Sequence, residues 1–413
     1  MTTVDAPPPP VGKAVVGGKQ TVADYARDRW VGLRSGELGN MPIIVGIIVI
    51  AAYFQYRNSN FLTAVNFVNL LIQMAPVAII GMGIVFVLLL GEIDLSVGYV
   101  SGVGAVITTL LLIPDSNQSP TWLAIAAGLA AGTAIGVLQG TIVAKIGVPS
   151  FVVTLAGLLA WNGAVLQILG SRGTVTIQDK FVNGLANDFF PHTQAWIIAE
   201  GSVGIYLILQ ILHVRSRRKA DLPNVPLPLI AARVVALAVA AGFVVDVANQ
   251  NRGVPYVAAV MLGFLMALSY LATRTKFGRY VYAVGGNAEA ARRAGINVAR
   301  IRIAVFAIAG FMAALGGIVL ASRLSSVDTD TGGGSILLDS IAAAVIGGTS
   351  LFGGRGQVRA AILGAIVISM IANGLGLLNT TAGTKFIVTG VVLLAAVTVD
   401  SIARKASQSA GRL

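Results

Sequence analysis

A succession of long apolar segments recurs along nearly the whole chain. Only helices and closed barrels satisfy their backbone hydrogen bonds in lipid, and these runs lack the apolar–polar alternation of barrel strands. The sequence therefore predicts an all-α, polytopic membrane helix bundle of about 10–12 segments, since a span needs roughly 20 apolar residues. The predicted segments lie at 41–54, 65–90, 99–113, 121–146, 151–169, 195–213, 229–247, 255–272, 303–321, 337–351, 358–378 and 386–402.

Two of these runs, 99–113 and 337–351, are too short to cross a bilayer. A helix rises about 1.5 Å per residue, and the hydrocarbon core is about 30 Å thick. We therefore expect both runs to be half-helices or re-entrant segments.

The composition supports residence in a membrane. Hydrophobic residues make up 56% of the chain and charged residues 11%, whereas a soluble domain carries about 25% charged residues. The absence of cysteine excludes a disulfide framework and a thiolate metal site. The net charge of +12 would suggest a nucleic-acid partner in a soluble protein. Here the charges concentrate between the apolar runs, so we expect a lipid bilayer and no nucleic acid as the partner.

The distribution of basic residues predicts the orientation and the domains. Lys and Arg cluster at 215–219, 274–302, 355–359 and 404–412, while the loops between them are poor in Lys and Arg and hold Asp115, Asp179, Asp188, Asp328 and Asp330. Because basic loops stay in the cytoplasm, both termini are expected there. The predicted parts are a partly disordered cytoplasmic tail at 1–40, a transmembrane domain at 41–405 and a short tail at 406–413. Within the first tail, 21–33 is either a short helix on the membrane surface or flexible chain.

The stretch 91–98, GEIDLSVG, places carboxylates between two apolar runs. A charged residue at membrane depth costs roughly 2.5 kcal/mol or more, and it is usually functional. One interpretation is a solute pathway in which Glu92, Asp94 and Ser96 face a cavity. The other is structural, with Asp94 or Ser96 simply capping the helix that begins near Val97.

The longest polar stretch between apolar runs, 273–302, predicts a docking element. Gly285, Gly286 and Asn287 form a turn signal. A short helix at 288–294 is expected to follow, with Asn287 as its N-cap and Gly295 as its stop. Such a helix at a membrane surface suits docking into a groove on another protein; the alternative is an ordinary basic loop.

A third polar feature is Asp339, which lies beside an apolar run that ends in a glycine-rich break at 347–354. This construction parallels 91–98, suggests two related halves and makes Asp339 a further candidate for the solute pathway. Asn162 and Asn373 lie inside apolar runs. They are expected to form hydrogen bonds between helices or, alternatively, to contact a solute.

The sequence contains no phosphate-binding loop of the form G-x-x-x-x-G-K-[ST] and no evident catalytic set. Its two histidines, His192 and His213, have no metal-ligand spacing. We therefore expect no enzyme activity, cofactor or metal in this chain.

Several long stretches carry a family resemblance: 91–98, 148–157, 275–300, 338–356 and the ending TVDSIARK. Together they resemble the permeases of the ribose/xylose group of ATP-binding-cassette (ABC) importers, from about residue 60 to 405. The extra apolar run within 223–252 is similar to the longer, xylose-type members. The resemblance implies a permease of the bacterial inner membrane that imports a monosaccharide, with a pentose such as D-xylose favoured.

The same resemblance implies partners and residue roles. Family members work as two permease copies with a cytoplasmic ATPase, which binds ATP and Mg, and an extracytoplasmic sugar-binding protein. Segment 273–302 looks like the coupling loop that the ATPase grips. The core of the EAA-type coupling motif of importer permeases is similar to Glu289, Ala290, Ala291 and Gly295. The leucine-proline that usually follows in this motif is absent here. In this scheme Arg292 and Arg293 steer docking.

Two other functions remain open from the sequence. One is a proton-coupled secondary sugar carrier that uses Asp94 or Asp339 as its proton site. The other is a permease of the same group for inositol, a nucleoside or a branched-chain amino acid.

Overall fold

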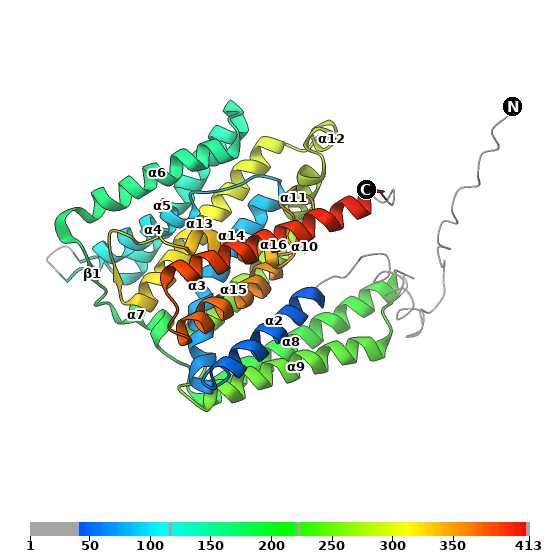
Figure 1. Ribbon diagram of the computed structural model, residues 1–413. Helices are drawn as coiled ribbons and strands as arrows, with labels where there is room; N and C mark the ends of the chain where they lie inside the picture. Colours follow the sequence, from blue (N-terminus) through cyan, green and yellow to red (C-terminus); the bar gives the residue numbers. More distant parts are fainter. Residues whose placement is uncertain (1–40, 115–117, 221–223, 410–413) are drawn as a thin grey trace. The chain divides into compact units, whose positions relative to one another are not determined.

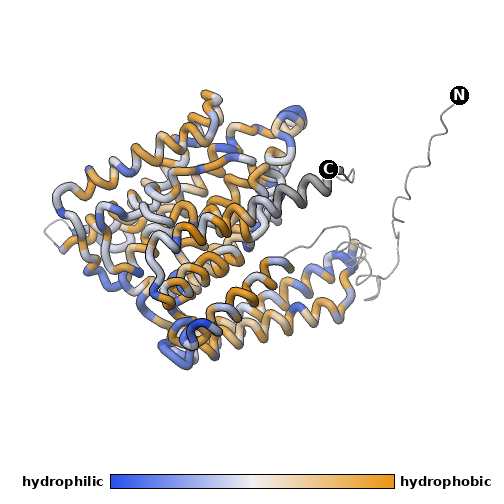
Figure 2. Tube along the Cα trace, viewed as in Figure 1, coloured by the Kyte–Doolittle hydropathy of each residue, from blue (hydrophilic) through white to orange (hydrophobic). Residues whose placement is uncertain are grey.

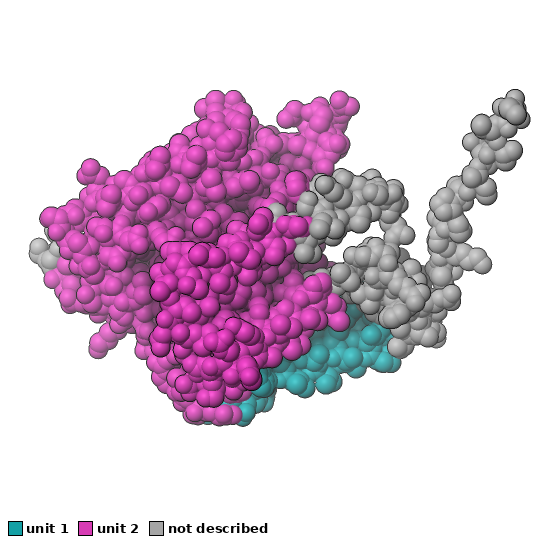
Figure 3. Space-filling view, viewed as in Figure 1, with its two compact units in different colours: residues 1–37, 193–246 teal, residues 38–192, 247–413 magenta. Residues whose placement is uncertain are grey.

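The computed structural model describes residues 41–114, 118–220 and 224–409, and these are almost entirely helical (Figure 1). The expected helix at 21–33 lies outside the described residues. The chain divides into two compact units, coloured in Figure 3. Among the described residues, unit 1 comprises 193–220 and 224–246, and unit 2 comprises 41–114, 118–192 and 247–409.

Unit 2 contains most of the helices. Its α-helices are α2 (Met41–Arg57), α3 (Ala64–Leu89), α4 (Val97–Leu111), α5 (Thr121–Thr141), α6 (Ser150–Leu169), α7 (Lys180–Asn187), α10 (Tyr256–Arg274), α11 (Lys276–Gly286), α12 (Ala288–Arg293), α13 (Val298–Leu324), α14 (Ile336–Ile346), α15 (Arg359–Leu377) and α16 (Ala382–Ser409). A π-helical turn, Ile142–Ile146, extends α5, and a short 3-10 turn, Gly170–Arg172, follows α6. Two-residue strands β1 (Val175–Thr176) and β2 (Ser326–Val327) pair antiparallel, with Val175 opposite Val327.

Unit 1 is built on α8 (His192–Lys219) and α9 (Leu227–Asn249). The first residue of α8 and the last three residues of α9 belong to unit 2. Both helices are apolar along most of their length, and most of their side chains are exposed. That combination is expected of helices surrounded by lipid, because lipid tails are as apolar as leucine.

The predicted membrane bundle is confirmed. Eight helices in the described residues are long and apolar enough to cross a membrane: α3, α5 with its π turn, α6, α8, α9, α10, α13 and α15. Figure 2 shows the apolar residues running along the helices. Four shorter apolar helices are α2, α4, α14 and the first part of α16, Ala382–Ala395. The two runs predicted to be short are α4, with 15 residues, and α14, with 11.

Helices α3 and α13 form the buried centre of unit 2. Small residues bring the backbones together there. A Cβ atom added at Gly132 of α5 would lie against the Gly310 carbonyl oxygen of α13, and one added at Gly310 would overlap the Gly132 carbonyl oxygen. Helices in lipid gain no hydrophobic free energy by associating, because lipid tails are as apolar as their side chains. Close backbone packing of this kind therefore supplies much of the attraction between them.

Two short helices, α7 and α11, are missing from the sequence prediction. Asp179 starts α7 because its Oδ1 accepts a hydrogen bond from the Val182 N–H at 2.8 Å, and its Oδ2 accepts one from the Thr121 hydroxyl at 2.6 Å. Polar residues interrupt both helices, so neither forms an apolar run. Figure 1 shows α7 and α11 at opposite ends of unit 2.

Candidate functional site

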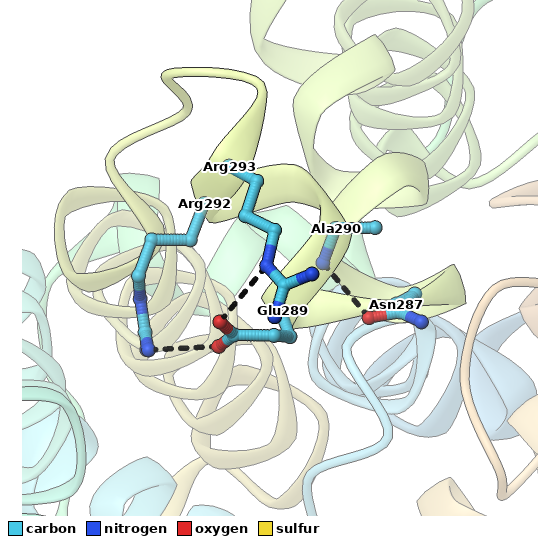
Figure 4. A network of polar contacts seen from close by, with 5 residues as sticks. All are labelled: Asn287, Glu289, Ala290, Arg292 and Arg293. Carbon is cyan, nitrogen blue, oxygen red and sulfur yellow. Dashed lines mark hydrogen bonds and ion pairs between the residues drawn. The ribbon is translucent and has the colours of Figure 1, made fainter.

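Helix α12 is a short helix at one end of unit 2 (Figure 1), and it carries a network of charged side chains (Figure 4). The Asn287 Oδ1 accepts a hydrogen bond from the Ala290 N–H at 2.9 Å, which confirms the predicted N-cap. Gly295 has φ +82°, and its N–H donates to the Arg292 carbonyl at 3.0 Å, as expected for a helix stop.

One side of α12 is exposed and charged. Glu289 lies 3.1 Å from Arg292 and 3.5 Å from Arg293, and all three side chains are more than half exposed. Exposed ion pairs of this type contribute at most about 1 kcal/mol. Ala291 on the other side is buried. The exposed side therefore offers Glu289, Ala290 and both arginines to a partner without needing them for stability.

Replacing Asn287 by Ala is expected to loosen α12. The loss of an N-cap costs about 1 kcal/mol, roughly a fivefold shift in the local equilibrium. Hydrogen–deuterium exchange should therefore become several-fold faster in the amides of 288–294. Asn287→Asp keeps the acceptor oxygen and should exchange like the parent protein. Unchanged exchange in Asn287→Ala would contradict the capping role.

The predicted turn signal Gly285-Gly286-Asn287 is wrong for the two glycines, which are helical residues at the end of α11, and right for Asn287, where that helix ends. A Cβ atom at Gly285 would overlap the Leu89 carbonyl oxygen at the end of α3 and lie 2.9 Å from the Gly354 nitrogen. The Gly354 N–H in turn donates to the Leu89 carbonyl oxygen at 2.9 Å. Gly285 is therefore needed for close packing, and the chain turns at Asn287 instead.

A second contact holds α11 against the loop that follows α14. The Tyr282 hydroxyl donates a hydrogen bond to the Gly356 carbonyl oxygen at 2.8 Å. Burial raises the pKa of Tyr282 above its ordinary value, so the hydroxyl keeps its proton at neutral pH. Helix α11 thus touches the end of α3 and the loop after α14 together.

The stretch 91–98 links this end of the bundle to α4. Gly91 adopts φ +74° just after α3, where glycine has no steric cost. Glu92 forms a 3.1 Å ion pair with Arg302 of α13, and these side chains are only 14% and 27% exposed. The predicted pathway role of Glu92 stays a prediction, and the structure gives its charge a partner.

Neutralising one member of this ion pair should cost more than neutralising both. Glu92→Gln or Arg302→Gln alone leaves a partly buried charge unpaired, which we expect to destabilise the protein by roughly 2 kcal/mol. The double variant removes that unpaired charge and should recover part of the loss. Thermal unfolding of the purified protein measures the cycle, and strictly additive losses would contradict the pairing.

Asp94 and Ser96 form a closed network before α4. The Asp94 Oδ1 accepts hydrogen bonds from the Ser96 N–H at 2.8 Å and the Ser96 hydroxyl at 2.7 Å. The Ser96 Oγ accepts one from the Gln139 side-chain amide at 3.0 Å. Both Asp94 and Ser96 are buried, and Ser96 makes no side-chain cap bond. This geometry favours the structural interpretation: Ser96 is the N-cap residue of α4, and the Asp94 carboxylate holds its N–H in place at the start of the helix.

A polar cavity of about 620 Å³ lies at the other end of unit 2, away from α12. It forms where α3, α13, α14, α15 and α16 begin or end. Asp339 and Asn373 both line it, so the structure brings these two predicted residues together. Asn162, half buried on α6, does not line it, and neither do Glu92, Asp94 and Ser96. The cavity-lining polar residues that the sequence analysis missed are Asn66, Asn69, Gln73, Arg323, Ser335, Ser369 and Lys385.

Asn373 is part of an amide cluster that joins α3 to α15. The Asn66 amide donates to the Asn373 Oδ1 at 2.9 Å, and the Asn373 amide donates back to the Asn66 Oδ1 at 3.0 Å. The Asn373 amide also donates to the Gln73 Oε1 at 3.3 Å. The predicted interhelical hydrogen bonding of Asn373 is therefore confirmed. Within the described residues, no group of three or more His, Asp or Glu side chains could hold a metal ion.

Residues 66–397 match the protein family described as branched-chain amino acid transport system / permease component. The xylose transport system permease protein XylH of Escherichia coli K12 is 37% identical over 380 residues, 91% of this chain and 95% of the relative. XylH of Haemophilus influenzae is 34% identical over 90% of this chain and 99% of the relative. The ribose import permease protein RbsC of E. coli K12 is 32% identical over 87% of this chain and 92% of the relative.

No solved structure matches the chain. The family match covers most of the chain, and the relatives align over nearly their full length. The same family and the eight candidate spans place the protein in the bacterial inner membrane, as predicted. The chain therefore belongs to this family of transport-system permease components.

Proposed function

We propose that the chain is the permease subunit of an ABC importer that moves a monosaccharide, a pentose such as D-xylose, into a bacterial cell. The relatives named for xylose and ribose support this substrate class. The observation that carries the coupling to an ATPase is the exposed, charged face of α12, which follows α11 with only Asn287 between the two helices. In this proposal ATP and Mg bind to the separate ATPase subunit.

The proposal places the α12 end of unit 2 in the cytoplasm, with both termini on that side. Basic residues near α12 support this orientation, since cytoplasmic loops carry an excess of Lys and Arg. They comprise Arg274, Lys276, Arg279, Arg292, Arg293, Arg300 and Arg302. A second copy of the chain and an extracytoplasmic sugar-binding protein complete the proposed importer.

The coupling mechanism follows from the contacts of α11. A force on α12 acts on Gly285, which packs on the Leu89 carbonyl oxygen and on Gly354. Leu89 leads directly into the stretch 91–98 and α4, while Gly354 follows α14. Movement of α11 would therefore shift α4 and α14 together. In an alternating-access cycle, these short helices are the elements that open and close the path.

Crosslinking from α12 tests the proposal, and the cysteine-free sequence makes single cysteines unambiguous. Arg293→Cys, in membranes that contain all native companions, should crosslink to a nucleotide-hydrolysing subunit. Phe181→Cys, on the exposed surface of α7 at the opposite end, should not. A partner without ATPase activity at Arg293→Cys would overturn the proposed coupling.

The energy source separates this proposal from a proton-coupled carrier. Sugar uptake should stop when ATP is depleted and continue when the proton gradient alone is collapsed. The opposite pattern would favour the carrier. Binding assays with the partner binding protein would distinguish a pentose from inositol, a nucleoside or a branched-chain amino acid.

A further inference from the structure

We propose that the polar cavity between α3, α13, α14, α15 and α16 is a transit site for one neutral monosaccharide. This inference rests on the proposed function, because it names where the imported sugar rests inside the permease. The volume, about 620 Å³, falls within the range of ligand pockets, roughly 300–1,000 Å³.

Several polar groups in the cavity retain unused hydrogen-bonding capacity. The Asp339 Oδ2 accepts from the Ser335 hydroxyl at 2.7 Å, which leaves its Oδ1 for a ligand. The Gln73 Oε1 accepts from Asn373, so its amide N–H groups remain available. In the part of the chain that the structure describes, Arg323 has no hydrogen-bond or ion-pair partner, although it is half buried. A guanidinium group in such a place is costly to leave unpaired.

The amide cluster holds these ligand groups in place. Asn66 and Asn373 are nearly fully buried, and each bonds the other. Asn66 also donates to the Phe61 carbonyl oxygen at 2.8 Å. Since their bonding capacity is largely used within the protein, we assign them a positioning role. They orient the Gln73 side chain toward the cavity.

The mixture of groups favours a neutral polyol over an anion. Each sugar hydroxyl both donates and accepts, so it can bridge a donor such as Arg323 or Gln73 and an acceptor such as Asp339. An anion needs donors only: Arg323 and Lys385 would attract it, whereas the Asp339 carboxylate offsets one of these charges and supplies the acceptor that only a hydroxyl donor can use. Apolar atoms of Pro76 and Val77 also line the cavity and offer a surface for the C–H face of a sugar ring.

The position of the cavity suits a solute that arrives from outside the cell. The helix ends that surround it lie away from α12, so the proposed orientation puts the cavity near the outer face. A sugar released by the binding protein would reach this cavity before it reaches the stretch 91–98. The buried Asp94–Ser96–Gln139 network then lies farther along the path.

A cysteine-protection experiment tests the site. Ala372 lines the cavity and is exposed, so Ala372→Cys adds one reactive thiol to a cysteine-free chain. The matched control is Ala220→Cys, at an exposed position just after α8. Both variants are purified in lipid nanodiscs and modified with a methanethiosulfonate reagent in the presence of D-xylose, D-ribose or inorganic phosphate.

We expect one of the two monosaccharides to slow modification of Ala372→Cys and to leave Ala220→Cys unaffected. A ligand at tenfold excess over its Kd protects about tenfold. Adding Asp339→Asn or Arg323→Gln to the Ala372→Cys protein should abolish this protection. Adding Asn162→Ala should not, because Asn162 lies outside the cavity.

The possible outcomes distinguish failure of the proposed transit site from failure of the proposed importer function. If the complete importer takes up a sugar with ATP but no sugar protects Ala372→Cys, the site is overturned and the function stands. Protection by a sugar in a complex that moves no sugar would overturn the function and retain the site. Stronger protection by phosphate than by either sugar would overturn the assignment to a neutral ligand.

Discussion

Gly285→Ala is expected to lower sugar-stimulated ATP hydrolysis and sugar uptake at least about tenfold while the protein still inserts into the membrane. The new Cβ atom would overlap the Leu89 carbonyl oxygen and approach the Gly354 nitrogen, and both obstacles are backbone. Overpacking of this kind costs about 1–3 kcal/mol, and every 1.4 kcal/mol corresponds to a factor of ten. Helix α11 must therefore move away from α3, and transport by the reconstituted importer should fall at least about tenfold.

The neighbouring glycine provides the control. Gly286 belongs to the same helix, but a Cβ atom there meets nothing within 4 Å. Gly286→Ala should transport normally and should be slightly more stable, since alanine is favoured over glycine in a helix by about 0.5–1 kcal/mol. Equal transport by the two variants, both recovered as folded protein, would show that the Gly285 contact does not carry coupling.

The apolar runs predicted the membrane bundle because each long run can only be a helix in lipid. The same method could not find α7 and α11. Their apolar residues lie on one face and alternate with polar ones, so neither stands out from a loop by hydropathy. For α12 the local signals were sufficient, since Asn287 and Gly295 are a helix cap and a helix stop whatever surrounds them.

Gly285 and Gly286 show where a local rule fails. A Gly-Gly pair usually marks a turn, because glycine tolerates many backbone conformations. In this protein Gly285 is helical, and its missing side chain makes room for the end of α3. That requirement comes from residues nearly 200 positions away in the sequence, and no local pattern reveals it.

The polar cavity was only partly predictable. Asp339 and Asn373 were found because single polar residues in apolar runs are conspicuous. Arg323 was missed because one arginine at the end of a helix resembles an ordinary orientation signal. One available signal was overlooked: Asn66, Asn69 and Gln73 have the spacing i, i+3 and i+7, so they share one face of α3, and all three line the cavity.

Gly310→Val is expected to cause the largest loss of stability, because it separates α5 from α13. A Cβ atom at Gly310 would overlap the Gly132 carbonyl oxygen and lie 3.2 Å from the Cα of Gly136, which faces α13 one turn farther along. Valine adds two further methyl groups, and the atoms that they would meet belong to the backbone of α5 rather than to a flexible side chain. We expect a destabilisation of about 3 kcal/mol, the upper end for overpacked sites. Thermal unfolding of the purified protein in detergent measures it.

The size of this effect follows from the way membrane helices associate. Close backbone packing holds α5 against α13, and lipid offers no hydrophobic force that would bring the two helices back together once they are pushed apart. Gly163→Val on α6 is the matched control, because a Cβ atom there meets nothing within 4 Å. Gly163→Val should therefore unfold close to the parent temperature. If Gly310→Val also unfolded close to the parent temperature, the packing of α5 on α13 could not be the contact that holds the centre of unit 2 together.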